Sequence, residues 1–128
     1  MAGVSEEQPK PRRTPFGLAL FWIGAGVNHF LVPRFYEPMV PPPLDRAAGP
    51  IIKLSGVAEI AVGAAALAPA TRRASGPAMI ALLVAVFPAN LYMALKPERF
   101  SRIPRWALIA RLPLQGVAAR WAWRATRS

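Results

Sequence analysis

Long apolar blocks separated by short polar segments dominate the pattern of this chain. Residues 16–32, 51–68, 76–95 and 106–123 are each rich in aliphatic and aromatic side chains. Their apolar positions run almost continuously instead of at amphipathic spacing, which is typical of membrane spans. The pattern therefore predicts an all-α fold, an integral membrane bundle of four transmembrane helices.

The third and fourth predicted spans differ most in polarity. The third contains no charged side chain, although Pro88 is expected to kink it and to free backbone groups. The nearby Asn90 either bonds to these groups or has a functional role. The fourth is the least apolar, but tryptophans lie at its two ends, as in the aromatic belts of membrane–water interfaces: Trp106, Trp121 and Trp123.

The segments between the spans are basic or rich in proline. Residues 33–50 contain six prolines, and the run of three at 41–43 favours an extended polyproline conformation. This segment either lies on the membrane surface and caps the bundle, or forms an ordinary loop. Residues 70–75 are expected to form a short basic turn, and residues 96–105 a basic loop.

The first residues of the chain differ from the rest. Residues 1–14 are polar and basic, which predicts a disordered tail before a membrane domain over residues 15–126. The pair Arg12-Arg13 before an apolar run also resembles a twin-arginine export signal. No A-x-A-like cleavage site follows that run, which disfavours the signal interpretation.

Composition supports a membrane protein. Of the 128 residues 54% are hydrophobic and only 17% charged, whereas about a quarter of a typical soluble domain is charged. The net charge is +10, but the basic residues lie mostly at the ends of the apolar blocks, where anionic lipid headgroups would meet them. A lipid bilayer is thus the expected partner, and nucleic acid is not.

The distribution of basic residues favours one orientation slightly. Eight lie on the side of the termini, namely Lys10, Arg12, Arg13, Arg72, Arg73, Arg120, Arg124 and Arg127. Six lie on the other, namely Arg34, Arg46, Lys96, Arg99, Arg102 and Arg105, with Lys53 nearby. The positive-inside rule then predicts a multi-pass protein of the inner or plasma membrane with both termini cytoplasmic.

Several polar side chains interrupt the spans. Glu59 lies near the centre of its helix, where an acidic side chain costs about 2.5 to 3.5 kcal/mol. Gly56, Gly63 and Ala66 share its helix face, so this face should pack closely inside the bundle. At helical rise, the other polar residues fall in the same half of the bundle, which predicts one ligand pocket: Asn28, His29, Glu59, Asn90, Arg111 and Gln115.

Within this pocket we expect Glu59 to pair with Arg111, surrounded by the other polar groups. The alternative is that the polar cluster only fixes the register of the helices. One His and one Glu are too few for the usual three or four metal ligands, and the chain has no cysteine, so no metal site is predicted. No nucleophile–His–acid set or phosphate-binding glycine loop is present, so the catalytic residues, if any, are unknown.

Four segments resemble the DoxX-like family of small four-helix membrane proteins. They are GAGVNHFLVPRFYEPMVPPPL, LSGVAEIAVGAAAL, ALLVAVFPANLYMAL and RLPLQGVAARWAW, and together they extend over most of residues 16–126. The resemblance implies a four-helix membrane bundle. It also puts functional weight on five of the polar residues: His29, Glu59, Asn90, Arg111 and Gln115.

The resemblance leaves three functions open. The first is a redox-linked membrane subunit that binds a quinone, with His29 and Glu59 handling protons and a separate redox partner supplying electrons, since the chain carries no cofactor motif of its own. The second is a non-catalytic accessory or assembly protein that binds another membrane protein through its small-residue face and proline-rich loop. The third is a small transporter, for which so short a chain would have to form an oligomer. The first is favoured, and neither enzyme activity nor oligomeric state is assigned.

Overall fold

The computed structural model describes Gly3 and residues 14–127, and within them every regular element is helical. In chain order these are α1 (Phe16–Leu31), α2 (Pro33–Tyr36), η1 (Glu37–Met39), η2 (Pro42–Ala47), α3 (Ala48–Leu67), α4 (Pro69–Leu95), η3 (Pro97–Phe100) and α5 (Arg105–Ala125). The predicted all-α class is therefore confirmed. Of the tail predicted over residues 1–14, only Gly3 and Thr14 are among the described residues; the rest of it, including the Arg12-Arg13 export signal, lies outside them.

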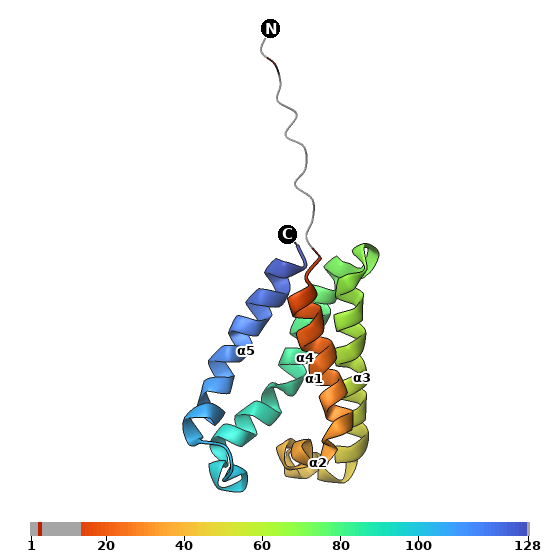
Figure 1. Cartoon of the computed structure of the whole chain (residues 1–128). Helices are drawn as coiled ribbons and strands as arrows, with labels where there is room; N and C mark the ends of the chain where they lie inside the picture. Colours follow the sequence, from red (N-terminus) through yellow and green to blue (C-terminus); the bar gives the residue numbers. More distant parts are fainter. Residues whose placement is uncertain (1–2, 4–13, 128) are drawn as a thin grey trace.

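The four long helices pack in chain order. The most extensive contact is between α1 and α3. α3 also packs on α4, and α4 on α5, whereas α1 and α5 have only a small contact. Figure 1 shows that α1 begins and α5 ends at one end of the molecule, while α2 and η3 lie at the other, here termed the loop end. α4 leads from the side of α3 to the side of α5 (Figure 1).

Two of the long helices qualify as membrane spans. Within the described residues, Pro42–Leu67 and Pro69–Leu95 are long and apolar enough to cross a membrane. Residues 16–31 qualify only together with Pro33–Met39, from which they are bent by 98°. α5 does not qualify by composition, so two or at most three of the four predicted spans are supported.

The outer surface of the helices is apolar. Leu20 is 66% exposed, Leu54 71% and Val84 66%, and each lies on a different helix. The tryptophans predicted to mark the ends of α5 are also exposed. A monomeric soluble protein rarely exposes so much contiguous apolar surface, so this surface is consistent with contact to lipid.

Proline determines where the helices begin and end. α1 ends at Leu31 because Pro33 disfavours helical geometry at the preceding residue, and Val32 has φ −132° and ψ 57°. Only Ala68, with φ −93° and ψ 128°, separates α3 from α4, because Pro69 is well suited to the first position of a helix. The basic turn predicted over residues 70–75 is therefore wrong, since these residues form the first turns of α4.

The proline-rich segment is also more regular than expected. Pro41 is extended, with φ −58° and ψ 147°, but Pro42–Ala47 form a 3-10 helix that leads directly into α3. The predicted polyproline conformation is thus limited to one residue. α2 and η1 fold back beneath α1, and Tyr36 and Met39 pack in a buried cluster at the loop end. Of the two interpretations of this segment, the cap of the bundle is the one observed.

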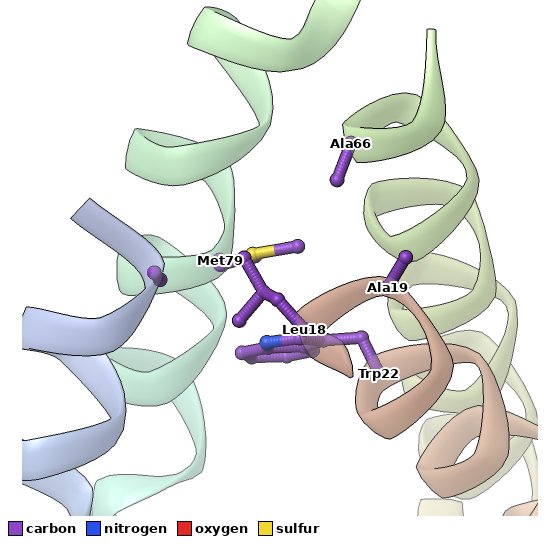
Figure 2. Packing of buried hydrophobic residues seen from close by; sticks show 6 residues of the cluster. Leu18, Ala19, Trp22, Ala66 and Met79 are labelled. Atoms are coloured by element: carbon purple, nitrogen blue, oxygen red, sulfur yellow. The ribbon is translucent and has the colours of Figure 1, made fainter. Parts of the chain in front are cut away.

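Buried apolar residues among those described form two clusters near opposite ends of the bundle. The first joins Leu18 and Trp22 of α1 to Ala66, Met79 and Ala122 of the other long helices (Figure 2). The second, at the loop end, consists of Met39, Met93, Phe100 and Leu108. These clusters pack the helices together near both ends of the bundle.

Glycine allows α1 and α3 to approach backbone to backbone. A Cβ atom added at Gly26 would lie 2.5 Å from the Gly56 carbonyl oxygen and 2.9 Å from the Ile60 nitrogen. A Cβ atom at Gly63 would lie 2.9 Å from the Ala19 carbonyl oxygen. The small-residue face predicted for α3 is therefore confirmed as a packing face. Because α1 covers it, it is not available to a partner protein.

A buried arginine ends α3. Arg72 Nε donates to the Ala66 carbonyl at 2.9 Å, and its Nη2 reaches the Leu67 carbonyl at 3.2 Å and Thr14 Oγ1 at 3.3 Å. A cation next to carbonyls at a helix C-terminus is favourable, because these groups lack partners within the helix and carry its negative partial charge. Arg72 was expected to face lipid headgroups, but it is only 6% exposed and is a cap for α3.

We predict that Gly26→Ala lowers the free energy of unfolding by about 1 to 3 kcal/mol, because the new methyl group meets backbone atoms that cannot move aside independently. Thermal or denaturant unfolding of the detergent-purified protein measures this. Gly24→Ala in the same helix is the matched control, since nothing lies within 4 Å of its added Cβ atom. Equal stability of the two variants would contradict the close approach of α1 and α3.

We also predict that Arg72→Met destabilises the protein by about 1.5 to 3 kcal/mol, the usual range for a hydrogen bond to a charged group. Arg73→Met removes the same charge from an exposed neighbour and should change stability by no more than about 0.5 kcal/mol. The same unfolding assay compares them. If both variants lose stability equally, net charge and not the cap is responsible.

Candidate functional site

A cavity of about 270 Å³ lies inside the bundle and is bordered by both hydrophobic clusters, through Trp22 and Leu83 on one side and Met39 on the other. Its walls come from α1, the α2–η1 segment, α3, α4 and α5, and are mostly apolar. Four of the six polar residues predicted to form a pocket line it, one from each long helix: His29, Glu59, Asn90 and Arg111.

Glu59 pairs with His29. Its Oε2 atom lies 3.0 Å from His29 Nδ1, and each side chain is 12% exposed. The predicted pair with Arg111 is therefore wrong. The reason is helix packing: the glycine contact holds α1 against α3, which brings His29 beside Glu59, whereas α5 packs on α4 and places Arg111 elsewhere on the cavity wall.

The same histidine nitrogen has a second oxygen neighbour. His29 Nδ1 lies 2.7 Å from the Ala25 carbonyl oxygen, one turn earlier in α1. Because a carbonyl oxygen only accepts, Nδ1 carries a hydrogen, and Nε2 is the nitrogen left for a molecule in the cavity. Glu59 Oε2 is buried and, within the described residues, receives no well-directed hydrogen bond, so it retains an acceptor position.

Tyr36 holds the histidine from the loop end. Its ring stacks on the His29 ring with a centroid distance of 4.0 Å and an interplanar angle of 13°. Asn28 Nδ2 donates to the Tyr36 hydroxyl at 2.6 Å. Asn28, which was expected in the pocket, does not line the cavity and instead positions the tyrosine that does.

A chain of amide hydrogen bonds joins α4 to α5. Asn90 Nδ2 donates to Gln115 Oε1 at 2.7 Å, and Gln115 Nε2 donates to the Leu83 carbonyl at 2.7 Å. A bond from Asn90 to the backbone groups freed by Pro88 was one of the two expectations. Asn90 bonds to Gln115 instead, because this side chain is within reach. Gln115 does not line the cavity and acts through Asn90.

Arg111 supplies a positive group on the α5 side. It lines the cavity and is partly buried. Within residues 14–127 its guanidinium forms neither an ion pair nor a hydrogen bond. A guanidinium presents up to five N–H donors, so Arg111 is suited to an acceptor oxygen in the cavity.

Two polar wall residues were not predicted, Tyr36 and Ser55. Ser55 precedes Glu59 by four residues, and this helical spacing alone would have placed it on the same face. Tyr36 gave no such signal, because its position depends on how the segment after α1 folds back.

The cavity combines donors and an acid within an apolar wall. The guanidinium of Arg111 is a donor, Nε2 of His29 accepts in the neutral ring and donates in the protonated one, and Glu59 accepts or donates a proton according to its state. Among the described residues, no group of three or more His, Asp or Glu side chains lies together as a metal site would require. The arrangement suits a small, largely apolar molecule with polar oxygen atoms.

Comparison with known proteins identifies a family. The model of a family described as "Domain of unknown function (DUF8561)" matches residues 18–126, so the chain belongs to this family. No curated protein and no solved structure matches the chain.

We predict that His29→Gln and Glu59→Gln are energetically coupled. Because the two side chains are in contact, the loss of stability in the double variant should differ from the sum of the single losses by about 0.5 to 3 kcal/mol. Pairing Glu59→Gln with Arg120→Gln, an exposed residue outside the cavity, should be additive within about 0.5 kcal/mol. Additive losses in the first cycle would disprove the pair.

Proposed function

We propose that this member of the DUF8561 family is a four-span, DoxX-like membrane subunit that holds a quinone-like molecule in its central cavity. The observation that carries the proposal is the juxtaposition of a partly buried, unpaired guanidinium with a His–Glu pair in an otherwise apolar cavity. The four sequence segments that resemble the DoxX-like family support the same choice.

The composition of the cavity wall fits a ring with two carbonyl oxygens. Arg111 donates to one oxygen, and Nε2 of His29 donates to the other when the ring is protonated beside Glu59, so hydrogen bonds come from both α5 and α1. Apolar side chains such as Val86 and Ile52 contact the ring itself. Drug-sized ligands usually need about 300 to 1,000 Å³, so about 270 Å³ suits a single ring headgroup.

When bound, a quinone supplies a group that accepts two electrons and two protons. The residues of this chain hold and move the protons: His29 Nδ1 is bonded to the Ala25 carbonyl and contacts Glu59, so the imidazole and the carboxyl group share a position for one proton. Electrons come from a separate redox partner protein, because the chain itself carries no metal or flavin motif.

The proposal includes α5 as a fourth span in a plasma or inner membrane. α5 is polar by composition, but Arg111 and the Gln115 amide face the bundle, and large apolar residues such as Leu114 and Val117 are on the outside. Its tryptophans fit the two membrane interfaces. The positive-inside count then favours cytoplasmic termini.

The two other functions have less support. Of the two predicted contact surfaces of an accessory protein only the proline-rich loop remains, because α1 covers the small-residue face of α3. A transporter would need an oligomer, for which no surface is indicated. We therefore retain them as outcomes of the test.

We predict that a quinone co-purifies with the protein in mild detergent, and that Arg111→Gln or Glu59→Gln reduces its amount about tenfold, the effect of losing roughly 1.4 kcal/mol of binding. Lipid extraction and mass spectrometry measure the quinone per protein. Lys53→Gln, an exposed change in the same helix as Glu59, is the control and should retain it.

Size-exclusion chromatography confirms that each variant is folded before extraction. Equal quinone in all variants would place the molecule outside this cavity and reject the proposal. Absence of any quinone together with a stoichiometric protein partner would favour the accessory function.

A further inference from the structure

A second hollow, separate from the central cavity, lies at the loop end. It has a volume of about 260 Å³ between the segment of α2 and η1 and the segment of η3 and the turn before α5. Three arginines line it, Arg34 from the first segment and Arg99 and Arg102 from the second. The rest of its wall is mainly apolar: Phe35, Pro38, Met39, Phe100 and Ile103.

These arginines are not neutralised by carboxyl groups of the described chain. Across residues 14–127 none of the three forms an ion pair with an acidic side chain; the one such pair within these residues joins His29 to Glu59. Glu37 and Asp45 line an adjoining hollow together with Arg99, but neither pairs with it. The two connecting segments, residues 33–47 and 96–105, together carry six basic and three acidic side chains, so an excess of positive charge remains.

Arg99 is also held in place. Its Nη1 donates to the Tyr92 hydroxyl, and its guanidinium lies 5.7 Å from the centre of the Tyr92 ring. Tyr92 in turn packs edge-on against Phe100, which belongs to the buried cluster of the loop end. The position of this cation is therefore fixed by the fold, which lowers the entropy lost when it binds an anion.

With α3 and α4 as membrane spans, this hollow would lie at the level of the membrane surface. The apolar helix α4 ends at Leu95, immediately before η3, and the apolar stretch that contains α3 begins at Pro42, just after η1. At this level lipid phosphates are the most abundant anions. Phe35, which is 51% exposed, extends the apolar wall of the hollow outward, where an acyl chain would lie.

We propose that this hollow binds the phosphate group of an anionic phospholipid. Guanidinium groups match phosphate oxygens in charge and in paired hydrogen-bond geometry. A free phosphate ion offers the same oxygens, but it has no apolar part to contact the apolar half of the wall. An acyl chain of a phospholipid does, so we propose the lipid as the occupant. This inference is independent of the function proposed for the central cavity.

The test measures the shift in unfolding temperature of the detergent-purified protein on adding phosphatidylglycerol, phosphatidylcholine or inorganic phosphate at equal phosphate concentration. We expect phosphatidylglycerol to give the largest shift. The variant Arg34→Gln/Arg102→Gln should lose at least half of it, with about tenfold weaker apparent binding. The control Arg73→Gln/Arg124→Gln removes the same charge from exposed positions outside the hollow and should keep the full shift.

Each alternative result rejects the proposal. Equal losses in the two double variants would show a general charge effect. A full shift with inorganic phosphate would show an anion site without a lipid. Equal shifts with both lipids would show that the arginines do not select the headgroup. If the first double variant is unfolded, the single variants Arg34→Gln and Arg102→Gln replace it against single-charge controls.

Discussion

The close approach of α1 and α3 at Gly26 and Gly56 determines the geometry of the rest of the molecule. With no side chain between them, the two backbones come near enough for residues one turn away to touch, and one such pair is His29 and Glu59. A carboxyl group in the middle of an apolar helix is expensive unless it has a partner, and this contact supplies one. The His29–Glu59 pair in the cavity is thus a consequence of two missing side chains.

Polar groups also join the remaining helices. Gln115 and Asn90 bridge α4 and α5 through amide hydrogen bonds, and Arg72 satisfies the last carbonyls of α3. In an apolar environment such polar groups must find polar partners inside the protein, because neither lipid tails nor apolar side chains offer hydrogen bonds. Each of these residues therefore orders a particular junction between helices, while the two apolar clusters supply most of the packing.

Periodicity and composition were sufficient to predict helices near residues 16–32, 51–68, 76–95 and 106–123, because a long apolar run has few other structures open to it. The gathering of His29, Glu59, Asn90 and Arg111 was also accessible, since helical rise gives the depth of each residue. Helical rise gives the depth of a residue but not the rotation of its helix about its own axis. The partner of Glu59 was therefore assigned to α5 instead of α1. The position of Tyr36 and the helical start of α4 depended on how prolines fit at helix ends and in folded-back segments, which a count of polar residues does not reveal.

The single residue between α3 and α4 has a consequence for biogenesis. Arg72 lies only a few residues beyond the carbonyls that it caps, so a hairpin of residues 48–95 contains its own helix ending and needs little from elsewhere in the chain. α1 is synthesised before this hairpin, so its glycine face has no partner helix, and His29 lacks Glu59, until residues 48–67 leave the ribosome. The order of translation thus leaves this face of α1 uncovered until α3 is made, and the acid and the imidazole meet only once α3 packs on α1.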